Sequence, residues 1–202
     1  MPDITAILLA AGMSQRMGAE NKLLLPFNGA PMVRRVAETY LAAIDGPVTV
    51  VTGYDAARLR DVLSSLPVTF AHNPSFESGQ PSSVAAGLAH APEADLLLIG
   101  LADQPLLKPG DLADLLALHR ASDPGKITIP MHRGVRGNPI VVPRSLRPRL
   151  TENPDRPGCM RFTRDHPEHV QAADLSAPGF YTDIDTPADY AALAVKSEAL
   201  LP

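Results

Sequence analysis

The chain has 202 residues, of which 45% are hydrophobic, and a formal net charge of −4 at pH 7. This length suits one domain, which we predict to span residues 1–202. The acidic balance argues against nucleic acid as a partner, and no apolar run is long enough to predict a membrane span. No basic segment precedes the first apolar run, and Cys159 is the one cysteine. We therefore expect no signal peptide, no internal disulfide and a cytoplasmic location.

The first apolar run, residues 4–9, predicts a buried strand, and small residues follow it at Ala10, Ala11 and Gly12. Small residues leave backbone N–H groups open to the oxygens of a phosphate group. In an open α/β sheet such a loop lies at the carboxyl end of a strand, where ligands bind. Short motifs also match by chance, so an ordinary strand-to-helix turn is the alternative.

Two cations follow this loop. Arg16 and Lys22 can supply fixed positive charge to the same anion. The stretch is not a P-loop, because Asn21 occupies the position before the lysine where that motif has glycine.

The longer pattern, LAAGxSxRMG followed by a lysine and Leu-Leu-Pro, resembles the signature of the MobA-like nucleotidyltransferases. It is most similar to the molybdenum cofactor cytidylyltransferase branch of that family. The resemblance implies a nucleotide-diphospho-sugar transferase-like fold, with a nucleotide held by Leu9, Ala10, Ala11 and Gly12. It also implies that Arg16 and Lys22 neutralise the phosphates and act in catalysis.

Alternating elements follow this loop. Helical spacing predicts a helix over 32–44, β-branched residues predict a strand over 47–52, Asp55 is expected to cap a helix ending at Leu66, and residues 68–71 form a short predicted strand. Such alternation predicts an α/β, Rossmann-like fold with a mostly parallel sheet and helices on both faces. We expect the chain up to about residue 105 to bind the nucleotide and the remainder to bind the acceptor.

A further helix is predicted over 82–91. Ser82 can serve as its N-cap, or it can face the nucleotide base. The spacing of Gly79, Ser83 and Gly87 resembles a GxxxSxxxG element of the same family. The resemblance implies that Gly79, Ser82 and Ser83 bind the nucleotide.

The wholly apolar run Leu96–Leu101 predicts a central strand that ends near Asp103. A carboxylate at this end of a parallel strand lies where ligands bind, and Mg²⁺ takes one or two carboxylates together with substrate phosphates and water. A turn or cap aspartate is the alternative. The segment from Ala102 to Pro105 resembles the family's GDxP element, with Ala102 in place of glycine. The resemblance implies that Asp103 binds Mg²⁺ and is catalytic.

The segment 132–143 contains two glycines, two arginines and a Gly-Asn-Pro, which indicates a loop facing a ligand. It resembles the RGHP segment of the molybdenum cofactor branch, with Asn138 where histidine is usual. The resemblance implies that Arg136 and Asn138 bind the acceptor, and a solvated hairpin loop is the alternative. The other elements predicted in this half are helices over 109–121, 144–150 and 187–198 and strands over 127–130, 140–142 and 170–175.

Two further segments complete the comparison with the family. Residues 153–166 resemble a segment in which the family has Gly-Ala-Arg before a helix. Near the end of the chain, Thr186, Pro187 and Asp189 are typical of a helix start, which accounts for neither Asp183 nor Asp185. The resemblance implies that Asp183 is the second metal ligand, opposite Asp103.

The resemblance carried by these motifs implies an enzyme that joins CMP from CTP to the terminal phosphate of molybdenum-bound molybdopterin and releases pyrophosphate, with Mg²⁺ as cofactor. The attacking phosphate is already an anion, so the reaction needs charge neutralisation and alignment more than a strong base. We therefore expect His72, His90 and His119 at the surface or in turns. We also expect the methyl group of Ala11 to leave room for a pyrimidine and to press on a purine.

Two alternatives stay open. One is a MobA-like transferase that uses GTP or another phosphorylated acceptor. The other is a non-catalytic carrier or chaperone of the molybdenum cofactor. Either kind of protein, like the cytidylyltransferase itself, could serve a client molybdoenzyme.

Overall fold

The computed structural model describes residues 3–18, 20–152 and 158–198. Eight of the strands in these ranges form one mixed sheet with the order β10-β7-β9-β6-β1-β4-β5, and β8 pairs with β7 outside that path. The strands are β1 (Ile4–Ala10), β4 (Val48–Thr52), β5 (Val68–His72), β6 (Leu96–Leu101), β7 (Ile127–His132), β8 (Val135–Arg136), β9 (Ile140–Pro143) and β10 (Val170–Asp174).

Most neighbours in this sheet are parallel. β5, β4, β1 and β6 run in one direction, and β7 and β10 are parallel to each other. β9 lies between β6 and β7 and is antiparallel to both. The carboxyl ends of β1 and β6 therefore meet at one edge, where a ligand is expected in an open α/β sheet.

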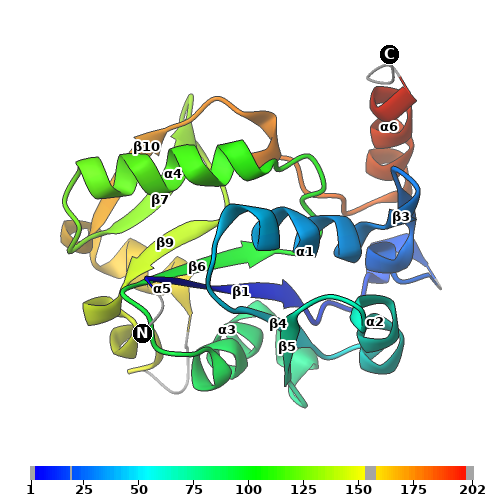
Figure 1. Ribbon diagram of the computed structural model, residues 1–202, viewed down its shortest axis with the longest axis horizontal. Helices are drawn as coiled ribbons and strands as arrows, with labels where there is room; N and C mark the ends of the chain where they lie inside the picture. The colour runs from blue at the N-terminus through cyan, green and yellow to red at the C-terminus, as the bar shows by residue number, and fades with distance from the viewer. Residues whose placement is uncertain (1–2, 19, 153–157, 199–202) are drawn as a thin grey trace.

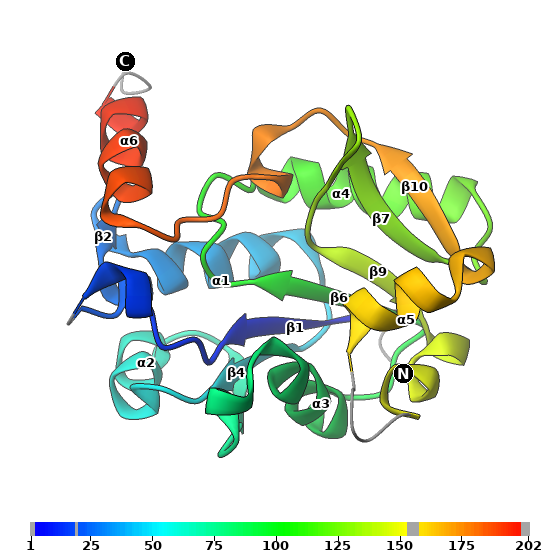
Figure 2. The ribbon, with the colours of Figure 1, turned by 180° about the vertical axis from the view of Figure 1, so that it is seen from behind.

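Helices cover both faces of the sheet (Figures 1 and 2). α1 (Met32–Ala43), α2 (Ala56–Leu63) and α4 (Pro109–Ala121) contribute to the apolar cluster on one face. α3 (Gln80–His90) and α5 (Cys159–Asp165) contribute to the cluster on the other face. The predicted α/β class is confirmed.

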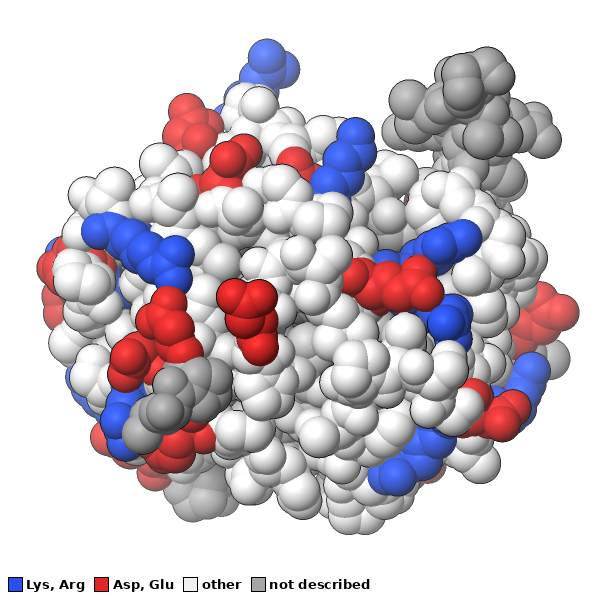
Figure 3. Space-filling view, viewed as in Figure 1, with Lys and Arg blue, Asp and Glu red and all other residues white. Residues whose placement is uncertain are grey.

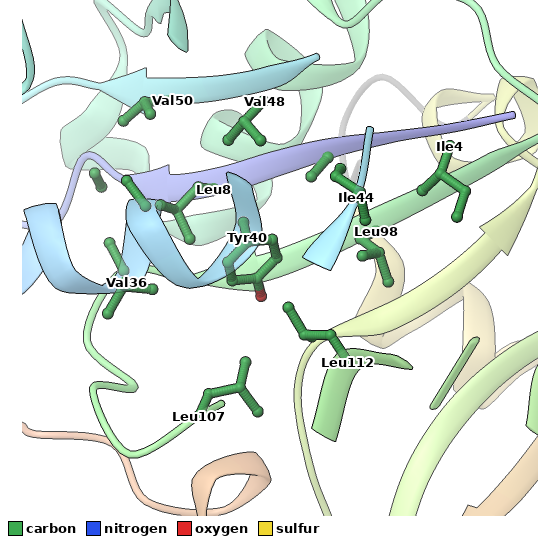
Figure 4. Packing of buried hydrophobic residues seen from close by; sticks show 14 of the residues in the cluster. Ile4, Leu8, Val36, Tyr40, Ile44, Val48, Val50, Leu98, Leu107 and Leu112 are labelled. Atoms are coloured by element: carbon green, nitrogen blue, oxygen red, sulfur yellow. The ribbon is translucent and has the colours of Figure 1, made fainter. Parts of the chain in front are cut away.

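β1 supplies both clusters, because successive side chains of a strand point to opposite faces. Leu8 packs under α1, whereas Ile7 packs under α3. The core under α1 contains Tyr40, which is fully buried (Figure 4). A Cβ atom at Gly100 would lie 1.8 Å from the Tyr40 hydroxyl, so the glycine makes room for this ring.

α3 lies close to the sheet because of a glycine within the helix. A Cβ atom at Gly87 would lie 2.7 Å from a side-chain carbon of Ile7 and 3.0 Å from one of Val51. Gly87 therefore lets α3 approach β1 and β4. Its role in the Gly79, Ser83 and Gly87 pattern is packing, whereas the first two residues lie nearer the ligand edge.

The C-terminal segment packs beside the loop that follows β1. α6 (Pro187–Glu198) stands next to the hairpin of β2 (Pro26–Phe27) and β3 (Ala30–Pro31) (Figures 1 and 2). Phe27, Met32, Ile184 and Leu193 form the buried cluster between them. This packing brings residues 183–185 over the loop, although they are distant from it in sequence.

The helix starts differ in detail from the expectations. α3 begins at Gln80 with Gly79 as its N-cap residue, so the N-cap alternative for Ser82 does not hold. Asp55 is the N-cap residue of α2, in a left-handed conformation (φ 57°), but its side chain pairs with Arg58 and makes no capping hydrogen bond. α2 ends at Leu63 rather than Leu66.

Other outcomes concern three histidines and the second half of the chain. His119 is fully buried and bonded through Nδ1 to Thr128, because α4 presses it against β7, whereas His72 and His90 are exposed as expected. The predicted helix over 144–150 is two short 3-10 turns, Arg144–Leu146 and Pro148–Thr151. Part of the predicted segment 153–166, residues 153–157, lies outside the described residues.

The surface over α1 and α4 carries acidic and basic groups interspersed among uncharged ones (Figure 3). Within the described part of the chain, no helix is long and apolar enough to cross a membrane. The prediction of one domain divided near residue 105 stays a prediction.

Candidate active site

Two adjoining clefts open at the ligand edge of the sheet. The first, of about 680 Å³, is lined by the loop after β1 and is called the loop cleft. The second, of about 880 Å³, is lined by Arg136, Arg161 and Arg164 and is called the arginine cleft. Leu9 and Asp183 are among the residues that line both. A ligand in one cleft therefore lies beside a ligand in the other.

The loop after β1 has one open position. A Cβ atom at Gly12 would meet nothing within 4 Å, so its backbone is accessible to a ligand. Ala11 lines the cleft but is only 4% exposed, and its Cβ would lie 2.9 Å from a Cβ at Gly53. Most of the Ala11 methyl surface thus belongs to the core, near Phe76. The structure gives little support to the expected contact of this methyl with a base.

Two 3-10 turns, Gln15–Met17 and Lys22–Leu24, carry the cations of the loop. The side chain of Asn21 caps the second turn by accepting a hydrogen bond from the Leu23 N–H at 3.1 Å. The hydroxyl of Ser14 accepts another from the Lys22 N–H at 3.2 Å. These bonds fix the backbone from which Lys22 projects.

Lys22 bridges two carboxylates. Its Nζ lies 2.5 Å from Asp103 Oδ2 and 2.8 Å from Asp185 Oδ1. Burial alone would lower the pKa of Lys22, but Asp103 and Asp185 outweigh it and the pKa is raised. Arg16 Nη2 lies 2.8 Å from the other oxygen of Asp185. Partial burial would raise the pKa of Asp185, but its contacts with Lys22 and Arg16 lower it overall.

Asp183 has a different partner. Gln104 Nε2 donates to Asp183 Oδ1 at 2.8 Å and to the Phe180 carbonyl at 3.1 Å. Desolvation and the nearby Asp103 raise the pKa of Asp183. Two carboxylates that raise the cost of each other's charge are a favourable place for a cation.

The donor set suits a hard divalent cation. Asp103 Oδ1 is buried and has no hydrogen-bond partner among the described residues, so one carboxylate oxygen is available as a ligand. The described residues contain no group of three or more His, Cys, Asp or Glu side chains that could hold a metal. Mg²⁺ needs no such group, because substrate phosphates and water complete its coordination.

The segment that carries Asp183 and Asp185 is held at both ends. The Ile184 N–H donates to the Asp103 carbonyl at 3.0 Å. The Asp189 carboxylate accepts from the N–H groups of Asp185 at 3.2 Å and Thr186 at 2.8 Å. The helix start predicted from Thr186 to Asp189 thus also fixes the position of Asp185.

The arginine cleft is lined by three arginines and by the carboxylates of Asp165 and Asp183, and Arg161 Nε lies 2.9 Å from Asp165 Oδ2. Arg136 Nη1 donates to Thr163 Oγ1 at 2.8 Å. Burial, together with the nearby Arg164, lowers the pKa of Arg136. Asn138 lines the same cleft, and its N–H donates to the Phe180 carbonyl at 2.9 Å. Cys159 also lines it, but burial raises the thiol pKa to about 12, which leaves the sulfur protonated and unreactive.

Every site residue predicted from the sequence lines one of the two clefts. The loop cleft holds Leu9, Ala10, Ala11, Gly12, Arg16, Lys22, Gly79, Ser83, Asp103 and Asp183. The arginine cleft holds Ser82, Arg136 and Asn138, with Leu9 and Asp183 shared. The hydroxyl oxygen of Ser82 accepts from Asn73 Nδ2 at 2.9 Å, and Ser82 lines the arginine cleft whereas Ser83 lines the loop cleft.

Sequence reasoning missed four residues of the site. Asp185 pairs with both loop cations, Gln104 orients Asp183, and Arg161 and Arg164 line the arginine cleft. Asp185 had a signal, since the helix start did not account for it. Arg161 lies in the segment that resembles the family's Gly-Ala-Arg, whereas Arg164 had no signal, because only the fold brings α5 beside the loop that carries Arg136.

Residues 6–170 match the family model of the MobA-like NTP transferase domain. The chain belongs to this family. It is 33% identical to the Nicotine blue oxidoreductase of Paenarthrobacter nicotinovorans over 92% of this chain and 94% of that protein. It is 28% identical to the molybdenum cofactor cytidylyltransferase of Escherichia coli K12 over 94% of this chain and 95% of that protein.

Solved structures agree with the fold of the MobA-like family. A nucleotidyl transferase from Methanothermobacter thermautotroptrophicus superposes with a TM-score of 0.82 at 23% identity, covering 98% of this chain and 99% of that one. A CMP:2-keto-3-deoxy-manno-octonic acid synthetase complexed with CTP superposes with a TM-score of 0.77 at 17% identity, covering 98% of this chain and all of that one. At these identities the likeness concerns the fold alone.

Proposed function

We propose that this MobA-like protein transfers CMP from CTP to the terminal phosphate of molybdenum-bound molybdopterin. The observation that carries the proposal is the junction of the two clefts at Asp183. On one side lie an open backbone at Gly12 and the cations of the loop, and on the other lies a pair of arginines. Such a layout suits two phosphorylated ligands that meet at a site of paired carboxylates. The relatedness to a molybdenum cofactor cytidylyltransferase favours this pair of substrates.

The reaction is an in-line displacement. A phosphate oxygen of the acceptor forms a bond to the α-phosphorus of CTP, and the bond from that phosphorus to the β-phosphate oxygen breaks. Pyrophosphate leaves with the electron pair of the broken bond. Lys22 and Arg16 neutralise the triphosphate, and their fixed backbone keeps the charges where they are needed.

Asp103 and Asp183 would hold Mg²⁺, which fits the available oxygen of Asp103 and the raised pKa of Asp183. A bound Mg²⁺ neutralises phosphate charge as the bond to the leaving group breaks. On the acceptor side, Arg136 and Arg164 bind the phosphate of the pterin, and Asn138 contributes a polar contact from the same wall. Alignment of the two substrates is then set by the wall that the clefts share.

The test measures pyrophosphate release with CTP, GTP, ATP or UTP, Mg²⁺ and molybdenum-loaded or metal-free molybdopterin. The expected result is release that depends on both CTP and the pterin, with a cytosine dinucleotide as the second product. GTP as the preferred nucleotide would make the protein a guanylyl transferase instead. A carrier or chaperone would bind the pterin and pass it to a client molybdoenzyme without releasing pyrophosphate.

The name of one relative requires a second assay. Because that protein is called a nicotine blue oxidoreductase and covers nearly the whole chain, reduction of nicotine blue by NADH or NADPH is tested in parallel. The chain has no GxGxxG dinucleotide-binding motif after β1, which argues against this activity. Dye reduction without pyrophosphate release would overturn the proposed transfer.

A further inference from the structure

The ammonium group of Lys22 occupies an unusual position. It lies between one oxygen of Asp103 and one oxygen of Asp185, at 2.5 and 2.8 Å, and only 11% of its side chain is exposed. An ammonium between two carboxylate oxygens stands where a divalent cation would be bound. The two carboxylates and the lysine come from three distant parts of the chain, so the fold itself assembles this bridge.

All three groups are held by backbone bonds. The Ile184 N–H ties the segment of Asp185 to the Asp103 carbonyl, and Asn21 caps the turn that carries Lys22. Asp185 is further fixed by Asp189. The carboxylate pair is therefore a prearranged feature and not a chance contact between mobile surface side chains.

This arrangement differs from the one expected when metal and nucleotide are bound. Lys22 cannot neutralise nucleotide phosphates while its ammonium bridges Asp103 and Asp185, and Asp103 Oδ2 cannot bind a metal while it binds Lys22. Arg16 adds a second bond to Asp185 and keeps the cluster close to electrical neutrality. Asp103 Oδ1 stays open beside this bridge, but a cation that arrives between Asp103 Oδ2 and Asp185 must take the place of the ammonium.

We propose that Lys22 is an internal counter-ion that occupies the divalent-cation position between Asp103 and Asp185 and is displaced from it by the metal. Displacement frees the ammonium for the phosphates, so metal binding and phosphate binding are coupled through one side chain. The proposal rests on the proposed function for the identity of the metal and the phosphates. It pairs Asp103 with Asp185 at the cation position, while Asp183 is the neighbouring carboxylate held by Gln104.

The experiment measures Mn²⁺ binding to the full chain, without nucleotide or pterin, from the loss of the free-ion electron paramagnetic resonance signal. Lys22→Met removes the competing ammonium, so Mn²⁺ should bind about tenfold more tightly or better than in the wild type. Arg16→Met removes the same charge from a contact with Asp185 alone and should give a gain of less than about threefold. Lys126→Met, at a surface pair with Asp123, should bind Mn²⁺ as the wild type does.

Double variants show which carboxylate takes part in the exchange of Lys22 for the metal. Adding Asp185→Asn to Lys22→Met should abolish the gain. Asp183→Asn should lower the Mn²⁺ affinity with and without Lys22, and so leave the ratio between the two affinities close to that in the wild-type background. If Lys22→Met does not fold, as judged by circular dichroism, Lys22→Gln serves in its place because it keeps a polar group of similar length. Unchanged Mn²⁺ affinity in the folded variant, or an equal gain in Arg16→Met, overturns the proposal.

These outcomes can be distinguished from success or failure of the proposed function. Mn²⁺ binding uses neither CTP nor molybdopterin, so the exchange can be confirmed in a chain that releases no pyrophosphate. Pyrophosphate release with an unaltered Mn²⁺ affinity in Lys22→Met would keep the transferase and reject the exchange.

Discussion

The two clefts differ in how their positive charge is balanced. In the loop cleft, Lys22 and Arg16 are already paired with Asp103 and Asp185. In the arginine cleft, Arg136 contacts the hydroxyl of Thr163, a neutral group. Both cations of the loop cleft are therefore bound to carboxylates before any ligand arrives, whereas in the arginine cleft Arg161 is paired with Asp165 and Arg136 is bound to a neutral group.

This difference separates two ways of binding a phosphate. A paired cation must first give up its partner, so the loop cleft should bind its anion best when a metal comes with it. An unpaired guanidinium can bind a phosphate directly, since Arg presents several donors to its oxygens. The arginine cleft should thus bind an organophosphate in the absence of metal.

The largest expected effect comes from removing a cation of the loop cleft that is paired with carboxylates. Lys22→Ala should lower turnover by about 10²-fold or more, as the loss of one preorganised electrostatic group does. It also leaves Asp103 without its counter-ion and Asp185 with Arg16 alone, so the melting temperature should fall and should recover in part when Mg²⁺ is added. Steady-state kinetics and thermal melts with and without Mg²⁺ check both effects. Lys126→Ala is the control, and wild-type turnover in Lys22→Ala would contradict the assignment.

A smaller effect is expected on the unpaired side. Arg136→Met or Arg164→Met should raise the KM for the acceptor by about tenfold, because each removes a charged hydrogen bond to its phosphate. The KM for CTP should stay the same, since neither residue lines the loop cleft. Arg133→Met, on the same hairpin but outside both clefts, should change neither constant. A rise in the KM for CTP with no change for the acceptor would mean that CTP, and not the acceptor, binds in the arginine cleft.

The same contrast explains what the sequence could predict. The residues of the loop cleft from Leu9 to Lys22 are local in sequence, and their spacing carries the ligand chemistry directly. Apolar periodicity and alternation were sufficient for the sheet and for helices on both faces. Asp103 was predictable because a charge directly after a wholly apolar strand has few structural uses.

The rest depends on contacts that no local pattern encodes. Arg164 faces Arg136 only because α5 folds back over the sheet, and Asp185 meets Lys22 only because the α6 segment packs on the β2–β3 hairpin. His119 was expected at the surface and is buried, because the polar partner that allows its burial, Thr128, lies on another element. Such pairs become visible only when the fold is known.

Ala11 gives a weaker test of the loop cleft. Its methyl group is mostly buried against Phe76 and Gly53, so Ala11→Gly should lower the free energy of unfolding by about 1–2 kcal/mol through lost burial and a more flexible loop. The ratio of kcat/KM for CTP and GTP should change by less than about threefold, which is below the usual worth of one methyl in a binding pocket. Urea unfolding and kinetics with both nucleotides measure the two quantities. A larger change in the ratio would restore the methyl as a determinant of base choice.

The smallest expected effect is a pH dependence of stability, in which His119 and the loop cleft respond in different ranges. His119 lies beneath the β7 and β10 side of the sheet, where its Nδ1 is 2.7 Å from Thr128 Oγ1 and Gln171 Nε2 is 2.8 Å from the same hydroxyl. Burial, with Arg120 adding to it, lowers the pKa of His119, so the folded state holds the neutral imidazole. The unfolded chain takes up a proton near the ordinary histidine pKa of about 6.5, and stability should therefore fall as the pH drops below that value.

The loop cleft should respond in a different range. The lowered pKa of Asp185 stabilises the fold above the ordinary aspartate pKa of about 3.9, and this contribution is lost only as the pH falls below it. Urea unfolding followed by circular dichroism from pH 7.5 to pH 5 should thus show a loss of stability that is smaller in His119→Gln, a variant that keeps a hydrogen bond to Thr128 but does not titrate. Asp185→Asn should leave the loss in this range unchanged. An equal pH dependence in wild type and His119→Gln would show that another titrating group carries the effect.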